Sequence, residues 1–212
     1  MRCQRLTRSL LCCVLLAGYA VFAAAAVKLP AVIGDNMVLQ RGQPVPIWGW
    51  ADKSETVTVA VAGQTLATKA GDDGRWKVTL AKLDVGPALQ MTVKDSSGTT
   101  IVLKNILVGE VWVCSGQSNM EMGIGMCNNA QAEIAAANYS QIRLFLVTKM
   151  KALQPVGNVN GDWVSCTPQS VAANGWGGFS AAAYYFGRQL HKKLNVPVGL
   201  IETAWGGTPA ES

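Results

Sequence analysis

Alternating hydrophobic and polar positions predict strands in the first half of the chain. The segment Thr56-Val-Thr-Val-Ala-Val61 alternates with a period of two residues, so one face of that strand should be buried and the other solvated. Other short apolar runs lie between stretches rich in Gly, Asp, Asn and Ser; they cover 37–39, 45–50, 76–80, 89–93 and 100–103. Short strands at this spacing predict a small all-β sandwich domain over residues 27–105.

The pattern changes after residue 105 to alternating strands and helices. Strands are predicted over 106–114, 142–147 and 198–201, and helices over 131–137 and 180–194. The second helix should begin at Ser180 as its N-cap and present one apolar face, formed by Phe179, Ala182, Ala183, Phe186, Leu190 and Leu194. Residues 149–178 are expected to be irregular. A helix between two such strands is typical of a right-handed crossover, so residues 106–212 predict an α/β domain.

A small polar turn follows the first strand of this second region. Val111 to Cys114 show no polar alternation, which predicts a buried parallel strand, and Ser115-Gly-Gln-Ser-Asn119 comes directly after it. Open α/β sheets bind ligands at the carboxyl ends of their strands, so a serine here could be a nucleophile if a base reaches its hydroxyl. Ser118 is preferred, because Ser115 precedes the turn at Gly116 and is expected to belong to the strand. The pattern alone also suits a plain turn between strand and helix.

Three separated stretches resemble the sialate O-acetylesterases, a family of SGNH-type carbohydrate esterases. They are Asn36-Met-Val-Leu-Gln-Arg41, Gly109-Glu-Val-Trp-Val-Cys-Ser-Gly-Gln-Ser-Asn-Met120 and Val196-Pro-Val-Gly-Leu-Ile-Glu-Thr-Ala-Trp-Gly-Gly-Thr208. The three occur in the family's order, and the resemblance covers almost everything after residue 26. It implies a β-domain ahead of a three-layer, flavodoxin-like SGNH hydrolase domain.

The resemblance also implies a chemistry and a set of site residues. Ser118 is then the nucleophile that removes acetyl groups from sugars, with no metal or organic cofactor. The backbone N–H groups of Gly206 and Gly207 are expected to face the same pocket and bind the oxyanion, with the Ser118 amide as another candidate and the Gln117 and Asn119 side chains as weaker donors. A turn without a functional role is the alternative for the two glycines.

The catalytic base is the difficulty for this interpretation. In the SGNH family it is a histidine three residues after an aspartate, and no Asp-x-x-His occurs in this sequence. His191 is the sole histidine, and its helical phase beside Lys192 and Lys193 predicts a solvated surface residue. Three strands also make a thin α/β domain with an open sheet edge. We therefore expect an incomplete hydrolase domain, the amino-terminal part of a longer esterase, which is inactive or weakly active by itself.

Composition predicts that the protein is exported and argues against a nucleic-acid partner. The formal charge of +5 includes Arg2, Arg5 and Arg8, which begin a segment with the pattern of a secretory signal peptide over residues 1–26. The mature protein is expected to be secreted or periplasmic, without a membrane anchor after cleavage. No basic run or aromatic–basic interleaving suggests nucleic-acid binding.

The cysteines and the lone histidine offer no metal-binding spacing. Cys114 is expected to be a buried thiol, whereas Cys127 and Cys166 fall in predicted loops and could pair in an exported protein. The sequence leaves that pairing open.

Two other interpretations remain open at this point. A glycan-binding module without catalysis would use the β-domain and Trp176, although Trp48, Trp50 and Trp76 are expected to be core residues of the sandwich. An acetylxylan-type esterase would use the same chemistry on another sugar. The expected partner is thus an O-acetylated sugar or glycan, and the sequence does not identify it or the oligomeric state.

Overall fold

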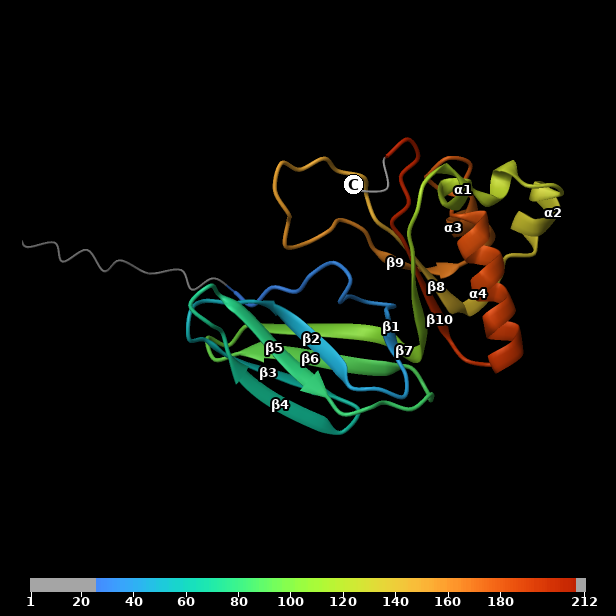
Figure 1. Ribbon diagram of the computed structural model, residues 1–212. Coiled ribbons are helices and arrows are strands. Elements are labelled where there is room, and N and C mark those ends of the chain that lie inside the picture. Colours follow the sequence, from blue (N-terminus) through green and yellow to red (C-terminus); the bar gives the residue numbers. More distant parts are fainter. Residues whose placement is uncertain (1–25, 209–212) are drawn as a thin grey trace, which may run out of the picture.

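The computed structural model describes residues 26–208 as strands stacked in two layers at one end and an α/β sheet at the other (Figure 1). The strands are β1 (Val38–Gln40), β2 (Val45–Trp50), β3 (Thr56–Val61), β4 (Gln64–Lys69), β5 (Arg75–Leu80), β6 (Leu89–Asp95), β7 (Thr100–Cys114), β8 (Tyr139–Leu146), β9 (Trp163–Cys166) and β10 (Val198–Glu202). The helices are α1 (Ser118–Glu121), the 3₁₀ helix η1 (Ile124–Met126), α2 (Ala130–Ala135), α3 (Pro168–Ala172) and α4 (Ala181–Leu194).

The long strand β7 joins the two ends of the molecule. Its first residues pair antiparallel with β6, its middle pairs parallel with β1, and its last residues pair parallel with β10. The prediction of two separate strands over 100–103 and 106–114 is therefore wrong. Between them the register with β6 shifts, and Asn105 takes a φ of +55°, so the polar Lys104-Asn105 pair marks a bulge within one strand.

A two-layer core fills the amino-terminal end. β2 and β5 form a two-stranded antiparallel sheet, which packs against the strands in the order β4-β3-β6-β7. Ile47 and Leu80 from one layer and Val57, Val59 and Met91 from the other are fully buried in one cluster. Residues 27–105 thus stack as the alternation predicts, but they share β7 with the rest of the chain, and their status as a separate domain stays a prediction.

The carboxyl-terminal end is an α/β sheet in the order β7-β10-β8-β9. β10 pairs parallel with both β7 and β8, as the strand–helix–strand pattern predicts, and β9 is antiparallel. α4 packs on β10 and β8 with Ala181, Ala183, Tyr184 and Gly187 buried. A Cβ on Gly187 would lie 2.6 Å from Leu200 Cδ1, so the helix approaches the sheet closely there.

The predicted apolar face of α4 is wrong in part. Phe186 is 41% exposed and Leu194 is 45% exposed, because the helix turns its Ala183–Tyr184–Gly187 side to the sheet instead. Phe186 meets Trp112 edge-on, with the ring centroids 5.0 Å apart.

The prediction of a buried strand at 111–114 also fails at two positions. Trp112 is 44% exposed and Val113 is 65% exposed, whereas Cys114 is buried. Among the described residues, β7 after Gly109 pairs with β10 along one edge only. Hydrophobic content without a polar alternation therefore does not guarantee neighbours on every side of a strand.

Several elements escaped the sequence pattern, among them the short helices α1 and η1. β4 is an edge strand that pairs with β3. It has no fully buried residue, so its polar composition did not predict a strand. β9 and α3 lie inside the stretch expected to be irregular. Thr167 caps α3 and exchanges hydrogen bonds with Ser170, with Pro168 at the first helical position, which is a local signal the sequence did contain.

The predicted signal peptide lies outside the described residues except for its last position, Ala26. Within residues 26–208, none of the helices combines the length and apolar character needed to cross a membrane.

Gly109 occupies the crowded point where β7 passes both β1 and the segment before β10. A Cβ there would lie 2.0 Å from the Pro197 carbonyl oxygen. We expect Gly109→Ala to lower the free energy of unfolding by at least about 2 kcal/mol, because a backbone atom must move. In urea unfolding, the control Gly86→Ala should change it by less than about 0.5 kcal/mol, since open space surrounds that position. Equal stabilities of the two variants would contradict this packing.

Candidate active site

Ser118 begins a short helix directly beyond the end of β7. The strand ends at Cys114, and Gly116 takes a φ of +149° in the turn that follows. The Gly116 carbonyl accepts a hydrogen bond from Trp205 N–H at 3.0 Å, which ties this turn to the segment after β10. Ser115 lies outside β7, so the expectation that it belongs to the strand is wrong. Both Ser115 and Ser118 are exposed.

The structure brings Ser118 and Gly206 together. A Cβ on Gly206 would lie 3.4 Å from both Cα and Cβ of Ser118. Their proximity follows from the sheet, because Cys114 and Glu202 are register partners at the carboxyl ends of β7 and β10. Gly207 is exposed, with a φ of +79° and open space where a side chain would be.

The other two predicted residues flank the serine. Gln117 Nε2 donates to the Thr208 carbonyl, so its side chain connects the turn before Ser118 to the turn at Gly206 and Gly207, called here the glycine turn. Asn119 is exposed. Four of the five predicted residues thus lie where the two turns meet or beside them, and Gly207 extends away.

The Gly206 N–H is already engaged. It donates to Oε2 of Glu121, whose other oxygen forms an ion pair with Lys149. The Lys149 ammonium and then the Gly206 N–H hold the pKa of the Glu121 carboxyl below its usual value, against the opposing effect of burial. The carboxylate therefore occupies the donor that an oxyanion would need, and the sequence analysis did not foresee this contact.

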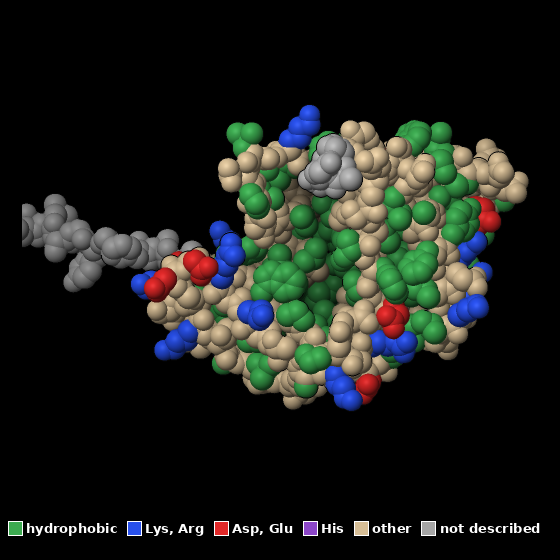
Figure 2. All heavy atoms as spheres, viewed as in Figure 1, with side chains coloured by type: hydrophobic (Ala, Val, Ile, Leu, Met, Phe, Trp, Pro, Cys, Tyr) green, Lys and Arg blue, Asp and Glu red, His purple; other side chains and the backbone are tan. Residues whose placement is uncertain are grey.

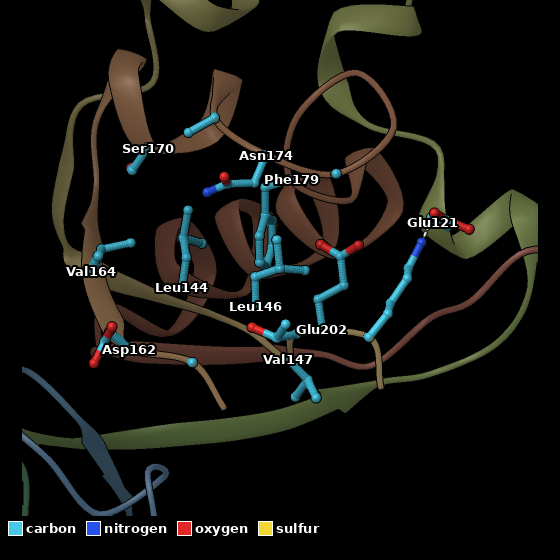
Figure 3. A pocket seen from close by; sticks show the side chains of 15 residues that line it. Glu121, Leu144, Leu146, Val147, Asp162, Val164, Ser170, Asn174, Phe179 and Glu202 are labelled. Atoms are coloured by element: carbon cyan, nitrogen blue, oxygen red, sulfur yellow. Dashed lines mark hydrogen bonds and ion pairs between the residues drawn. The ribbon is translucent and has the colours of Figure 1, made fainter. Parts of the chain in front are cut away.

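A cavity of about 550 Å³ opens beside this ion pair. Its walls come from the ends of β8 and β10, the loop from β8 to β9, and the segment after α3. In Figure 3, Glu202 lies between Phe179 and Glu121, and Asn174 lies beside Phe179. Ser118 is not among the lining residues, but Glu121, three residues further along the same helix, is.

Glu202 is a buried carboxyl that the sequence analysis missed. Its side chain lies at the end of β10, the residue is only 1% exposed, and Oε2 accepts a hydrogen bond from Ser180 N–H at 2.8 Å. Burial is the main cause that raises its pKa to about 7, and the nearby Glu121 charge adds to it. The sequence did contain an indication of this carboxyl, since an acidic residue directly follows the apolar run 198–201 at the carboxyl end of a predicted strand.

His191 lies at the opposite end of the sheet. Its Nδ1 is 2.8 Å from the Val196 carbonyl oxygen, and Val196 precedes β10, whereas Ser118 lies beyond the other end. The ring also meets Tyr139, with centroids 6.1 Å apart, so His191 is half-buried rather than fully solvated as predicted. The inference that it cannot serve Ser118 agrees with this position.

The three cysteines after the signal segment are free thiols. Cys114 and Cys166 are buried, and burial raises the pKa of each to about 11. The Cys127–Cys166 disulfide left open by the sequence is not formed. Across residues 26–208, no group of His, Cys, Asp and Glu side chains has an arrangement that could hold a metal ion.

Glu202 should make stability depend on pH. Its pKa is about 7 in the folded protein and near the ordinary 4.5 in the unfolded chain, so the folded state binds the extra proton. This contribution is complete below about pH 4.5 and is lost as the pH rises through about 7, amounting to about 3 kcal/mol. Urea unfolding at pH 5 and pH 8 should show this loss, and Glu202→Gln should remove it.

Glu110→Gln is the control for this measurement, since hydrogen bonds from Arg41 and Gln40 lower the pKa of Glu110. That variant should keep the loss between pH 5 and pH 8. An unchanged pH dependence in Glu202→Gln would contradict the assignment.

Comparison with known proteins identifies relatives of this chain. The chain is 32% identical over 198 residues to the sialate O-acetylesterase of Rattus norvegicus and 31% identical over 201 residues to that of Homo sapiens. Each match covers 87% of this chain but only 36% and 38% of the relatives, so the chain spans little more than a third of their length. No family model matches the chain.

A solved structure of a carbohydrate acetylesterase has a similar fold. The crystal structure of a carbohydrate acetylesterase from Xanthomonas citri superimposes with a TM-score of 0.81 at 34% sequence identity. The match covers 88% of this chain and 42% of that protein. The chain is therefore related, over most of its length, to the sialate O-acetylesterase family of carbohydrate esterases.

Proposed function

We propose that this chain carries the nucleophile of a carbohydrate O-acetylesterase, and that Ser118 is the attacking residue. The observation that carries the proposal is the meeting of Ser118 with Gly206 at the carboxyl ends of β7 and β10, beside a cavity large enough for a sugar. The relatives named for acetyl-ester hydrolysis support the same reaction.

The reaction proceeds through an acyl-enzyme. The Ser118 hydroxyl loses its proton to a base as its oxygen bonds to the acetyl carbonyl carbon, and the carbonyl oxygen becomes an oxyanion. The bond to the sugar oxygen then breaks, and that oxygen takes the proton. Water repeats the sequence to release acetate and free the serine.

Oxyanion stabilisation requires one local rearrangement. The Gly206 N–H can donate to the oxyanion only after it leaves the Glu121 carboxylate. The Ser118 and Gly207 amides and the Gln117 and Asn119 side chains complete the set of proposed donors. Glu121 acts here as a positioning residue, since it connects α1 to the glycine turn until substrate arrives.

The proton acceptor is proposed to come from polypeptide outside the 212 residues. The single histidine lies at the wrong end of the sheet, and Lys149 and Gly206 hold the Glu121 carboxylate in its charged, weakly basic form. Without a base, a serine hydrolase loses on the order of a thousandfold or more in rate. Weak activity is therefore expected of this chain alone.

Charge at the cavity favours an uncharged sugar over a sialic acid. Glu121, Asp162 and Glu202 line the cavity with Lys149 as the one cation among its described lining residues, and that cation is paired with Glu121. A sugar carboxylate would meet like charges there. An acetylated, uncharged sugar, encountered outside the cell after export by the predicted signal peptide, is thus the preferred substrate.

The test measures acetate release from O-acetylated xylo-oligosaccharide and from O-acetylated sialic acid, with and without added imidazole as a substitute base. We expect slow release that imidazole increases, that is faster on the neutral sugar, and that Ser118→Ala reduces to the rate of imidazole alone. His191→Ala is the matched control and should change nothing.

Two outcomes would contradict the proposal. Full release by Ser118→Ala would exclude this serine as the nucleophile. Loss of release in His191→Ala would show that the base lies within the chain.

A further inference from the structure

A second cavity lies on the outer face of the two-stranded sheet formed by β2 and β5. It has a volume of about 310 Å³ and shares no lining residue with the cavity beside Ser118. Its lining consists of Trp48, Gly49, Trp50, Arg75, Trp76, Lys77 and Gly157. We call this surface the tryptophan groove.

Sheet register arranges two indoles and two cations on this face. Trp48 is the register partner of Lys77, and Trp50 is the partner of Arg75. Residues two apart on a strand point to the same side, so both tryptophans and both cations line up on the outer face. Trp48 is 38% exposed and Trp50 is half-buried, so the prediction that both are core residues is wrong for Trp48.

The floor of the groove is closed by the Lys28 backbone and the Trp76 indole, which lie against Gly49. A Cβ on Gly49 would lie 2.1 Å from the Lys28 carbonyl oxygen and 2.9 Å from Cζ2 of Trp76, so only glycine fits there. Trp76 is 3% exposed, and its indole N–H has no hydrogen-bond acceptor among the described residues. Trp76 alternates with Arg75 and Lys77 along β5, so its indole points into the core and closes the base of the groove.

One wall of the groove belongs to the loop that borders the active-site cavity. Gly157 lines the groove from the middle of the loop between β8 and β9, while Lys149 and Asp162 near its two ends line the other cavity. Figure 2 shows a hollow lined by hydrophobic side chains, with Lys or Arg side chains on its rim. The two cavities therefore lie on either side of one loop.

We propose that the tryptophan groove is an accessory binding site for a glycan chain whose sugars carry carboxylates. Indole faces provide flat apolar surfaces for sugar rings, and the two cations beside them match carboxylates in sign. No acidic residue lines the groove, which is the reverse of the acid-lined cavity beside Ser118. Arg75 also pairs with Asp73 at 3.6 Å, but both side chains are mostly exposed, so this pair is weak.

This site goes beyond the proposed esterase function and does not depend on Ser118. The groove would hold the charged stretch of a mixed polysaccharide while uncharged acetylated sugars reach the cavity across the loop. Its ligand is thus a polymer with carboxylated units, not the ester being cleaved.

The test titrates the chain carrying Ser118→Ala with hexagalacturonate and with neutral cellohexaose, followed by calorimetry. The serine variant removes turnover, so binding is measured whatever the fate of the proposed reaction. We expect hexagalacturonate to bind more tightly than cellohexaose, with an affinity that falls as salt is raised. Trp48→Ala should weaken binding by about tenfold or more, and Lys77→Glu should weaken it for hexagalacturonate alone.

Trp176→Ala is the matched control, because Trp176 is 48% exposed and lies outside the groove. It should leave binding unchanged, and thermal unfolding should show that all variants are folded. Absence of binding to hexagalacturonate would overturn the proposal. Equal losses in Trp48→Ala and Trp176→Ala, or an unchanged affinity in Lys77→Glu, would also overturn it.

Discussion

The parallel pairing of β7 with β10 is the constraint on which the rest of the site depends. The two strands run in register from Glu110 and Val198 to Cys114 and Glu202, so they end together. The residues proposed for the esterase reaction follow within a few residues of those ends. This pairing brings together the turn before Ser118 and the turn at Gly206, although 88 positions of sequence separate the two residues.

Buried polar groups then fix how the two turns meet. The Glu121 carboxylate bridges the Gly206 N–H and the Lys149 ammonium, which connects α1, the glycine turn and the β8–β9 loop. A buried carboxylate is tolerated only when it is paired in this way. Glu202 lacks an equivalent cation of its own, and burial raises its pKa to about 7. The same cavity thus holds one carboxyl that stays charged and one that titrates near neutrality.

Local pattern predicted the parts of the fold that depend on local chemistry. The alternation of Thr56–Val61 and the cap at Ser180 correctly placed β3 and the start of α4. Contacts between residues distant in sequence could not be predicted from the local pattern. The unbroken course of β7, the exposure of Val113 and the face of α4 that meets Leu200 all depend on which neighbour a strand or helix receives. At the site, the residue types near Ser118 and Gly206 were recognisable through family resemblance, whereas the Glu121 bridge required knowledge of Lys149, 28 residues away.

The central claim is that the hydroxyl of Ser118 is the reactive nucleophile of this surface. The most direct measurement uses a fluorophosphonate, a reagent that modifies activated serines. The chain reacts with it in the presence of imidazole, and peptide mass spectrometry then locates the adduct. The account predicts an adduct on Ser118 that forms faster than on any other serine. An adduct on Ser115 or elsewhere, with Ser118 unmodified, would contradict it.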